Sequence, residues 1–406
     1  LTLGSTSQSP IIASSPSAFP KAFSFDHLYI NNIFNSFLYH VSNNNHNQII
    51  LKNSFLSNIL NSAIYLTSAN YTNLIINNQT VNDYVFSQDS CFSNCQATNQ
   101  PACGGAIYED RTYGDLLIKS TVFTHCTASA FGGAIYTNGN QIFLHSCTFY
   151  ECKCGETGMT LFHNKVKFPG GQYFNDQFDQ TRFSNNEGKH DLLDLNGDYI
   201  QFINSNLSYN KNIESNEQSS SIQYCVCLPI LGHAHSMNFM YNNLVSNDGD
   251  CLVCVDEKPD WSLTYKYLNF INNYNLNYYF NFIGTVKSSL YMENFLFYRN
   301  KPKATSSSIL ISNGDSVDQF TFTNCMFDKS KDQVKTLLNQ HFETGGVFDV
   351  TIGSSKGYTY TFEYAYSYTK PSQCYVPDEI INLGTDYFSE SNLFTQSVPF
   401  SASSSF

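Results

Sequence analysis

The chain has 406 residues and a formal net charge of −12; 13% of its residues are charged and 16% are aromatic. The acidic balance argues against nucleic-acid binding, which depends on basic surfaces. A chain this aromatic is not expected to be disordered, because disorder goes with low hydrophobicity and high net charge. We find no apolar run of about 18 residues, the length that a membrane-spanning helix needs, and therefore expect no span in this chain.

Residues 1–25 are rich in Ser and Pro, and we expect a loose lead-in or an N-terminal cap there. The central part of the chain, residues 26–350, carries a repeat. In its fullest form a Phe is followed three residues later by Cys, and then by a Gly-Gly-Ala-Ile segment. Self-similarity at a period of about 20 to 50 residues is typical of a solenoid. The positions that carry the repeat are Phe92, Cys95, Gly104, Gly105, Ala106 and Ile107, then Phe123, Cys126, Gly132, Gly133, Ala134 and Ile135, and finally Phe149 and Cys152.

A weaker form of the repeat, Phe followed three residues later by a polar residue, extends to both sides. Two of its intervals, after Phe55 and after Phe202, are long enough to suggest two coils each. In the first, Asn77 and Asn78 stand where a polar corner is missing. The further pairs are Phe37/His40, Phe55/Asn58, Phe183/Asn186, Phe202/Ser205, Phe239/Asn242, Phe270/Asn273, Phe297/Asn300 and Phe322/Cys325.

Short apolar segments between turn residues, without helical periodicity, predict an all-β fold, a single-domain parallel β-helix over residues 26–350. One coil cannot bury its inward Phe and Ile, but coils stacked about 4.8 Å apart can. The polar residues should then form a ladder along a corner, and the glycine pairs should allow a tight turn. The alternative, a β-sandwich, would place the Phe side chains on different faces. We expect two buried stacks, Phe92 with Phe123 and Phe149, and Phe270 with Phe297 and Phe322.

The C-terminal part shows two further patterns. Tyr alternates with other residues between Tyr358 and Tyr368, which predicts half-buried strands in a cap over residues 351–385. In residues 386–406 a Phe recurs every six residues among Ser and Thr. Such a low-complexity segment offers no core, so we expect a stalk or linker there.

The cysteines leave alternatives open. Cys95, Cys126 and Cys152 share one repeat position, so they should stack as disulfides or as a ladder of buried thiols. A second group of cysteines lies near two histidines and suggests a zinc site. However, the paired ligand spacing of a zinc site is incomplete, so stacked or disulfide-bonded core cysteines are favoured instead. We expect no metal site. This second group comprises Cys225, Cys227, Cys251 and Cys254, with His233 and His235 between them.

An enzyme acting on polysaccharide is the second class of protein that the sequence suggests. Gly232-His233-Ala234-His235 is similar to a segment of pectin-degrading β-helix hydrolases, and Asp248 and Asp250 supply carboxylates. Glycoside hydrolysis needs two carboxyls about 5 to 9.5 Å apart. The companion Asp pair and Arg-x-Lys of those enzymes are missing here, so we expect no catalytic residues and no cofactor.

Three Asn-x-Ser/Thr sequons, at Asn70, Asn78 and Asn206, are possible N-glycosylation positions. Together with 13 cysteines they favour a secreted or surface protein.

The alternation of Phe-x-x-Asn with Gly-Gly-Ala-Ile resembles the repeat of chlamydial polymorphic outer membrane proteins. The form with Cys in the last place, in an Asn-rich chain, resembles related surface proteins of trichomonad protists, in which similar Phe/Ser hexads precede a membrane anchor. The resemblance implies a right-handed β-helix ectodomain, without catalysis, that serves adhesion or coat formation outside the cell. It implies a membrane-anchored parent protein and a host-cell, matrix or self-association partner. The alternative function is that of a secreted or surface carbohydrate-binding or carbohydrate-active β-helix.

Overall fold

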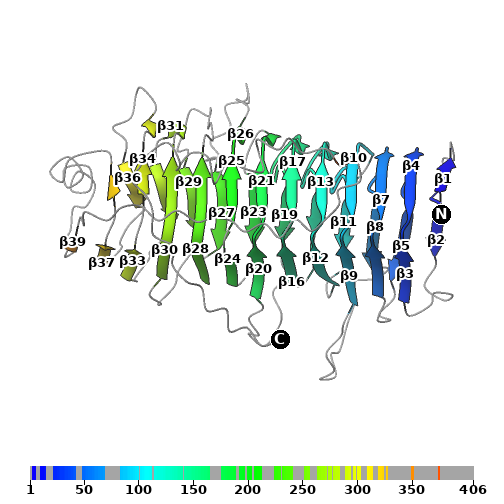
Figure 1. Cartoon of the computed structure of the whole chain (residues 1–406), viewed down its shortest axis with the longest axis horizontal. Helices are drawn as coiled ribbons and strands as arrows, with labels where there is room; N and C mark the ends of the chain where they lie inside the picture. The colour runs from blue at the N-terminus through cyan, green and yellow to red at the C-terminus, as the bar shows by residue number, and fades with distance from the viewer. Residues whose placement is uncertain are drawn as a thin grey trace, which may run out of the picture.

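The computed structural model is a parallel β-solenoid in which every pairing between described strands is parallel (Figure 1). It describes residues 22–212 except 43–47, 69–82, 100, 112–113, 140, 165–174, 189–191, 197–198 and 204. It also describes residues 2–5, 10–14, the strands between 224 and 351, and Cys374. Beyond Lys211 the described side chains are few. They are those of Leu268, Phe270, Ile271, Asn273, Asn300 and Cys374. The predicted all-β parallel β-helix is confirmed.

Each coil contributes one strand to each of three faces. Face 1 comprises β3 (Ala22–Asp26), β6 (Gln48–Lys52), β9 (Asp83–Gln88), β12 (Gly114–Lys119), β16 (Gln141–His145), β20 (Asn175–Asp179), β24 (Tyr199–Ile203), β28 (Leu231–Met240), β30 (Leu263–Ile271), β33 (Ser289–Glu293), β37 (Gln319–Thr323) and β39 (Asp349–Thr351). The long strands β28 and β30 continue into face 2.

Face 2 comprises β1 (Thr2–Ser5), β4 (Tyr29–Ile33), β7 (Phe55–Ile59), β10 (Cys91–Ala97), β13 (Val122–Thr124), β17 (Thr148–Tyr150), β21 (Arg182–Ser184), β25 (Asn206–Ser208), β34 (Leu296–Tyr298) and β38 (Met326–Phe327). Short strands follow it at a corner: β14 (Thr127–Ala128), β18 (Lys153–Cys154), β22 (Glu187–Gly188), β26 (Lys211–Asn212), β31 (Tyr274–Leu276) and β35 (Lys301–Pro302).

Face 3 is a separate sheet of 11 strands that follow one another in chain order. It comprises β2 (Ile12–Ser14), β5 (Leu38–Ser42), β8 (Ile64–Ser68), β11 (Ile107–Asp110), β15 (Ile135–Thr137), β19 (Leu161–Asn164), β23 (Leu193–Asn196), β27 (Tyr224–Pro229), β29 (Cys251–Asp256), β32 (Tyr278–Ile283) and β36 (Ile309–Asn313).

The first coil begins inside the segment expected as a loose lead-in. Residues 2–5 and 12–14 form β1 and β2, which pair with β4 and β5 of the next coil. The predicted cap strands and Phe/Ser hexads lie outside the described residues, with the exception of Cys374.

The chain turns between faces at residues with positive φ that recur from coil to coil. Before face 3 the turn residue is Gly104, Gly132 or Gly158, with φ between 62° and 69°. This confirms the predicted role of the glycines, because only glycine adopts this region without steric cost. The neighbouring Gly105 serves close approach instead, since a Cβ there would collide with backbone oxygens of the next coil. Non-glycine residues occupy the other corners. They are His27, Asn53, Asp89, Ser120, Ser146 and Gln180 before face 2, and Asn32, Asn58, Asn94, His125, Glu151, Asn185 and Tyr209 at its end.

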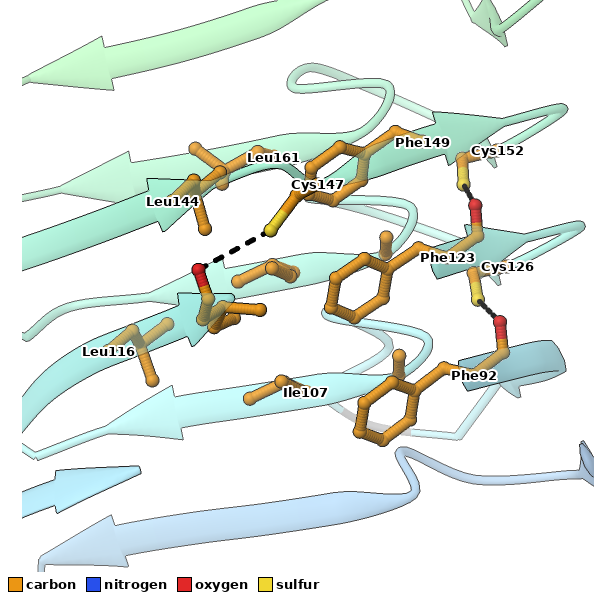
Figure 2. Packing of buried hydrophobic residues seen from close by; sticks show 14 of the residues in the cluster. Phe92, Ile107, Leu116, Phe123, Cys126, Leu144, Cys147, Phe149, Cys152 and Leu161 are labelled. Carbon is orange, nitrogen blue, oxygen red and sulfur yellow. Dashed lines mark hydrogen bonds between the residues drawn. The ribbon is translucent and has the colours of Figure 1, made fainter. Parts of the chain in front are cut away.

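The core is organised by the predicted Phe stack on face 2 (Figure 2). The rings of Phe92 and Phe123 lie 5.1 Å apart, and those of Phe123 and Phe149 lie 4.7 Å apart, nearly parallel in both cases. Phe183 continues the stack at 4.9 Å. All four side chains are fully buried. Aliphatic residues hold the same position at both ends, with Ile30 and Leu56 before Phe92 and Leu207 after Phe183.

Three details of the predicted register were wrong. Phe55 pairs with Cys91, so the stack position belongs to its neighbour Leu56. A shift of one residue exchanges inward and outward side chains in a strand, and the apolar pair Phe-Leu does not reveal which one faces in. Phe202 belongs to face 1, where its ring stacks on Phe178 at 4.4 Å. Phe37 also lies off the stack, immediately before β5 of face 3.

The two long intervals are single coils and not pairs of coils. Leu56 pairs directly with Phe92, and Leu207 pairs directly with Phe239. The extra residues therefore belong to a longer connection within one coil. The predicted partner Phe322 was also wrong, since it lies on face 1 beside Met292. Phe327 takes the place after Phe297.

Candidate functional site

The repeated polar position, three residues after the stacked Phe, forms an internal ladder. The thiols of Cys126 and Cys152 lie 3.6 and 3.7 Å from the carbonyl oxygens of Phe92 and Phe123, one coil before (Figure 2). Asn186 fills the same position in the next coil, and its Nδ2 donates to the carbonyl oxygen of Phe149 at 3.3 Å. Cys and Asn therefore do the same structural work, which is to join each corner to the preceding coil.

The ladder cysteines are free and buried, so the structure corresponds to the thiol alternative and not to stacked disulfides. Burial raises the pKa of the Cys95 and Cys152 thiols, and it raises the pKa of Cys147 to about 12. A thiol with a raised pKa is a poor nucleophile, because the thiolate is the reactive form. Cys95, Cys126 and Cys152 have no solvent exposure, so these positions hold coils together and no external substrate can reach them.

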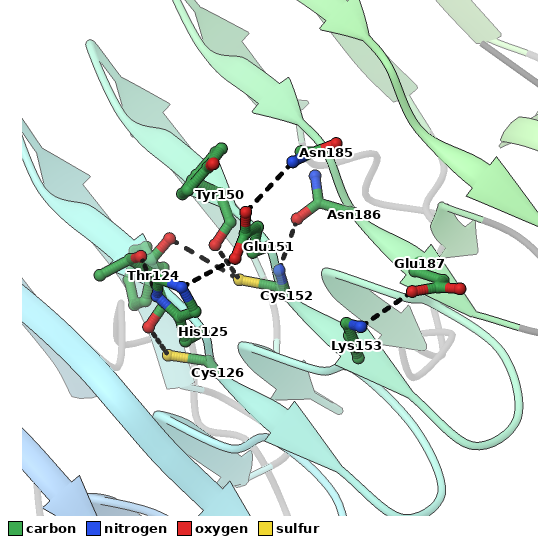
Figure 3. A network of polar contacts seen from close by, with 11 residues as sticks. Thr124, His125, Cys126, Tyr150, Glu151, Cys152, Lys153, Asn185, Asn186 and Glu187 are labelled. Carbon is green, nitrogen blue, oxygen red and sulfur yellow. Dashed lines mark hydrogen bonds and ion pairs between the residues drawn. The ribbon is translucent and has the colours of Figure 1, made fainter. Parts of the chain in front are cut away.

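Directly outside this ladder lies a row of exposed polar contacts (Figure 3). Glu151 contacts His125 Nε2 at 2.8 Å and accepts a hydrogen bond from Asn185 at 3.1 Å. Two residues further along the same coil, Lys153 Nζ lies 2.8 Å from Glu187. Each charged group is paired with its counterpart in the neighbouring coil. Such exposed pairs contribute little stability individually, and they leave no carboxylate pair poised across a substrate.

An aromatic column runs along the outside of face 3. Four rings, those of Tyr39, Tyr65, Tyr108 and Tyr136, stack at centroid distances of 5.0, 4.5 and 5.1 Å. Phe162 extends the column at 5.2 Å. Burial against neighbouring rings raises the pKa of Tyr65 and Tyr108, and that of Tyr136 to about 12. These hydroxyls are therefore neutral at physiological pH.

A parallel polar column lies beside the rings. Tyr108 donates to Asp110 at 3.3 Å, and Asn138 donates to the same carboxylate at 2.8 Å. The sequence already contained a signal for the aromatic column, because a Tyr directly follows the inward Ile in each full repeat. Strand alternation sends that Tyr outward.

Charged residues inside the solenoid are also paired. Arg111 contacts Glu109 at 2.5 Å, and both side chains are almost fully excluded from solvent. His40, which the sequence placed at a corner, is instead inward on face 3, and burial and the charge of Arg111 lower its pKa to about 4. In a later coil His163 lies 3.3 Å from Asp176, and both are fully buried. These groups have no access to solvent and cannot reach an external substrate.

The residues considered for zinc are separated by the fold. The backbone places Cys227 beside Cys254 on face 3, whereas His233 and His235 lie on β28 of face 1. Asp248 and Asp250 lie outside the described residues. Within the described ranges, no group of three His, Cys, Asp or Glu side chains could hold a metal ion.

Two of the three sequons, Asn70 and Asn78, lie outside the described residues. Asn206 is on β25 and is 1% exposed, so a glycan there is incompatible with this fold.

One disulfide joins Cys91 of β10 to Cys374, with Cα atoms 6.3 Å apart. Sequence spacing gave no indication of this pairing, because the two cysteines are 283 residues apart.

No protein-family model, curated protein or solved structure matches this chain. The part of the chain that the structure describes holds no helix long and apolar enough to cross a lipid bilayer.

Proposed function

We propose that this chain is a non-catalytic, cell-surface structural or adhesion ectodomain: a β-helix rod displayed outside the cell for adhesion or coat formation. The observation that carries the proposal is the arrangement of its side-chain columns. The aromatic column of Tyr39 to Phe162 and the polar rows at the corners bond from coil to coil along the rod. Catalysis instead needs different groups that converge on one reacting atom.

The location outside the cell is supported by the disulfide between Cys91 and Cys374. Disulfides persist in oxidising compartments and are rare in the cytosol. The parent protein is proposed to be membrane-anchored, by resemblance of the Phe/Ser hexads in residues 386–406 to the stalks of trichomonad surface proteins. The partner on this proposal is a host cell, a matrix component or a sister molecule.

Binding of a carbohydrate is the second candidate, and the aromatic column beside Asp110 and Asn138 is the observation that favours it. Sugars pack against the open faces of aromatic rings, with polar groups at the side. In this column the planes of Tyr65 and Tyr108 differ by 18° and those of Tyr108 and Tyr136 by 6°, so neighbouring rings stack face to face. The rings therefore present edges and not faces, which favours the structural role.

Labelling of intact cells tests the location. An antibody raised against residues 92–152 should bind unpermeabilised cells that express the parent protein. Signal confined to permeabilised cells would remove the basis of the proposal. An antibody to a cytosolic protein, applied to the same cells, controls for membrane integrity.

A binding comparison separates the two candidate functions. On the structural reading, neither the unmodified chain nor the variant with Tyr65→Ser and Tyr136→Ser should bind a glycan. The variant should differ from the unmodified chain only in its lower stability. Saturable binding of a polysaccharide by the unmodified chain, abolished in this variant while it remains folded, would instead establish the carbohydrate function.

A further inference from the structure

Most outward side chains of face 2 from β7 to β25 are buried, although outward residues of a solenoid normally contact solvent. On the other faces, outward residues such as Tyr136 and Phe143 are partly exposed. On face 2 the corresponding residues from β7 to β25 are at most 6% exposed, except Ser93 of β10, which is partly exposed. Those in the two outward columns are Phe55, Cys91, Val122, Thr148, Arg182 and Asn206, and Ser57, Thr124, Tyr150, Ser184 and Ser208.

Several of these side chains need a cover on chemical grounds. Arg182 is fully buried, although Arg side chains are almost never fully excluded from solvent at a protein surface. Phe55, Val122 and Tyr150 are apolar or aromatic, and they form a separate cluster outside the core that also contains Cys91 and Cys374. Face 2 therefore carries an outer apolar cluster that the solenoid itself does not enclose.

Cys374 indicates which segment of this chain lies over face 2. Its side chain is fully buried, and it is bonded to Cys91 of β10. The last described strand before it, β39, lies nine strand spacings further along the rod, which is about 43 Å. Residues 352–373 must span this distance in reverse, and an extended chain of that length reaches about 75 Å.

We infer that face 2 is an intramolecular docking surface for the C-terminal segment 352–373, which runs back along the rod over β25 to β13 and is fastened by the Cys91–Cys374 disulfide. The covered stretch from β10 to β25 measures four strand spacings, about 19 Å, so the returning segment is long enough to cover it.

The composition of the segment fits the surface. Tyr and Phe alternate with Thr, Glu, Ala and Ser from Tyr358 to Tyr368, so one side of an extended chain is wholly aromatic. Glu363 is its only carboxylate, and the 11 residues to Cys374 give it about 36 Å of reach. Arg182 lies three strand spacings from Cys91, about 14 Å. Glu363 is therefore within reach of Arg182.

Peptide mapping of the full-length protein tests the fastening. Free thiols are blocked in denaturant without reductant, and the digest is analysed by mass spectrometry. A peptide that joins Cys91 to Cys374 is the expected result. Reduced cysteines at both positions, or a glycan on Asn206, would overturn the inference, since a glycan cannot share a covered surface.

Oxidative footprinting of tyrosines tests the cover itself. In the full-length chain Tyr150 should be modified slowly, and in full-length Cys374→Ser at least about fivefold faster, because the fastening is lost. Tyr136 on face 3 serves as the internal reference and should react equally in both proteins. Cys103→Ser, which removes a buried free thiol, is the matched variant and should leave Tyr150 protected. Equal protection of Tyr150 in Cys374→Ser and in the unmodified chain would overturn the inference.

Discussion

Replacement of Phe123 by Ala tests the internal stack where it is best formed. The Phe123 ring is fully buried and has a parallel ring on each side, at 5.1 and 4.7 Å. Truncation of a buried Phe to Ala costs about 3 to 5 kcal/mol, through lost transfer energy and the cavity that remains. Coil stacking limits collapse from above and below, so we expect the upper part of this range.

Two matched variants make the result specific. Phe143 belongs to the neighbouring strand row but faces outward and is only partly buried, so Phe143→Ala should cost about 1 kcal/mol or less. Phe123→Leu should cost less than Phe123→Ala, because Leu56 and Leu207 already occupy the same position in other coils.

Urea unfolding followed by far-ultraviolet circular dichroism measures these differences. Solenoids can unfold in parts, so hydrogen exchange of β13 and β17 should accompany the measurement. Equal losses for Phe123→Ala and Phe143→Ala would show that the stack does not stabilise the fold as argued.

Three further predictions concern other parts of the described solenoid. Asn186→Ala should lower the free energy of unfolding in urea by about 1 to 3 kcal/mol, because the Asn186 side chain accepts a hydrogen bond from Cys152 N and donates one to Phe149 O. Asn186→Cys should cost less than Asn186→Ala. The reverse order would contradict the shared role of Cys and Asn. Gly105→Ala should lower the stability of the fold strongly, since a Cβ at position 105 would meet backbone oxygens. A melting temperature equal to that of the unmodified chain would exclude this close packing. His40 has a pKa of about 4 in the folded chain and about 6.5 when unfolded. The stability that comes from keeping His40 neutral is therefore fully present above pH 6.5 and is lost as the pH falls toward 4. The loss is at most about 1.4 kcal/mol per pH unit. His40→Gln should therefore lose less stability between pH 7 and pH 5 than the unmodified chain, and identical losses would refute this assignment.

The sequence predicted the fold class because the spacing of the repeated residues shows which positions recur in every coil. Phe92, Phe123 and Phe149 recur with a Cys three residues later, and a position that repeats in this way must face the same surroundings in every coil. The glycine turns followed from the same pattern. Where the repeat weakens, the register became ambiguous, as at Phe55 and Leu56, because two adjacent apolar residues satisfy either direction of the strand.

Other features could not be predicted for physical reasons. The corner residues with positive φ include Glu151 and Tyr209, which have no marked preference for that conformation. The coil imposes it on them. The Cys91–Cys374 bond depends on where a distant segment returns, which no local pattern encodes. The burial of the Glu109–Arg111 ion pair likewise depends on how the coil encloses these two side chains, which their sequence positions do not indicate.

Dityrosine cross-linking tests the coil register most directly. Brief photo-oxidation of the folded chain should join Tyr65 to Tyr108 and Tyr108 to Tyr136, whose rings lie 4.5 and 5.1 Å apart. Tyr65 should not be joined to Tyr136, because the ring of Tyr108 lies between them. Tyr108→Phe should abolish both products. Mass spectrometry of the digest would contradict the account if Tyr65 were joined directly to Tyr136, or if tyrosines of face 3 were joined only to residues outside this column.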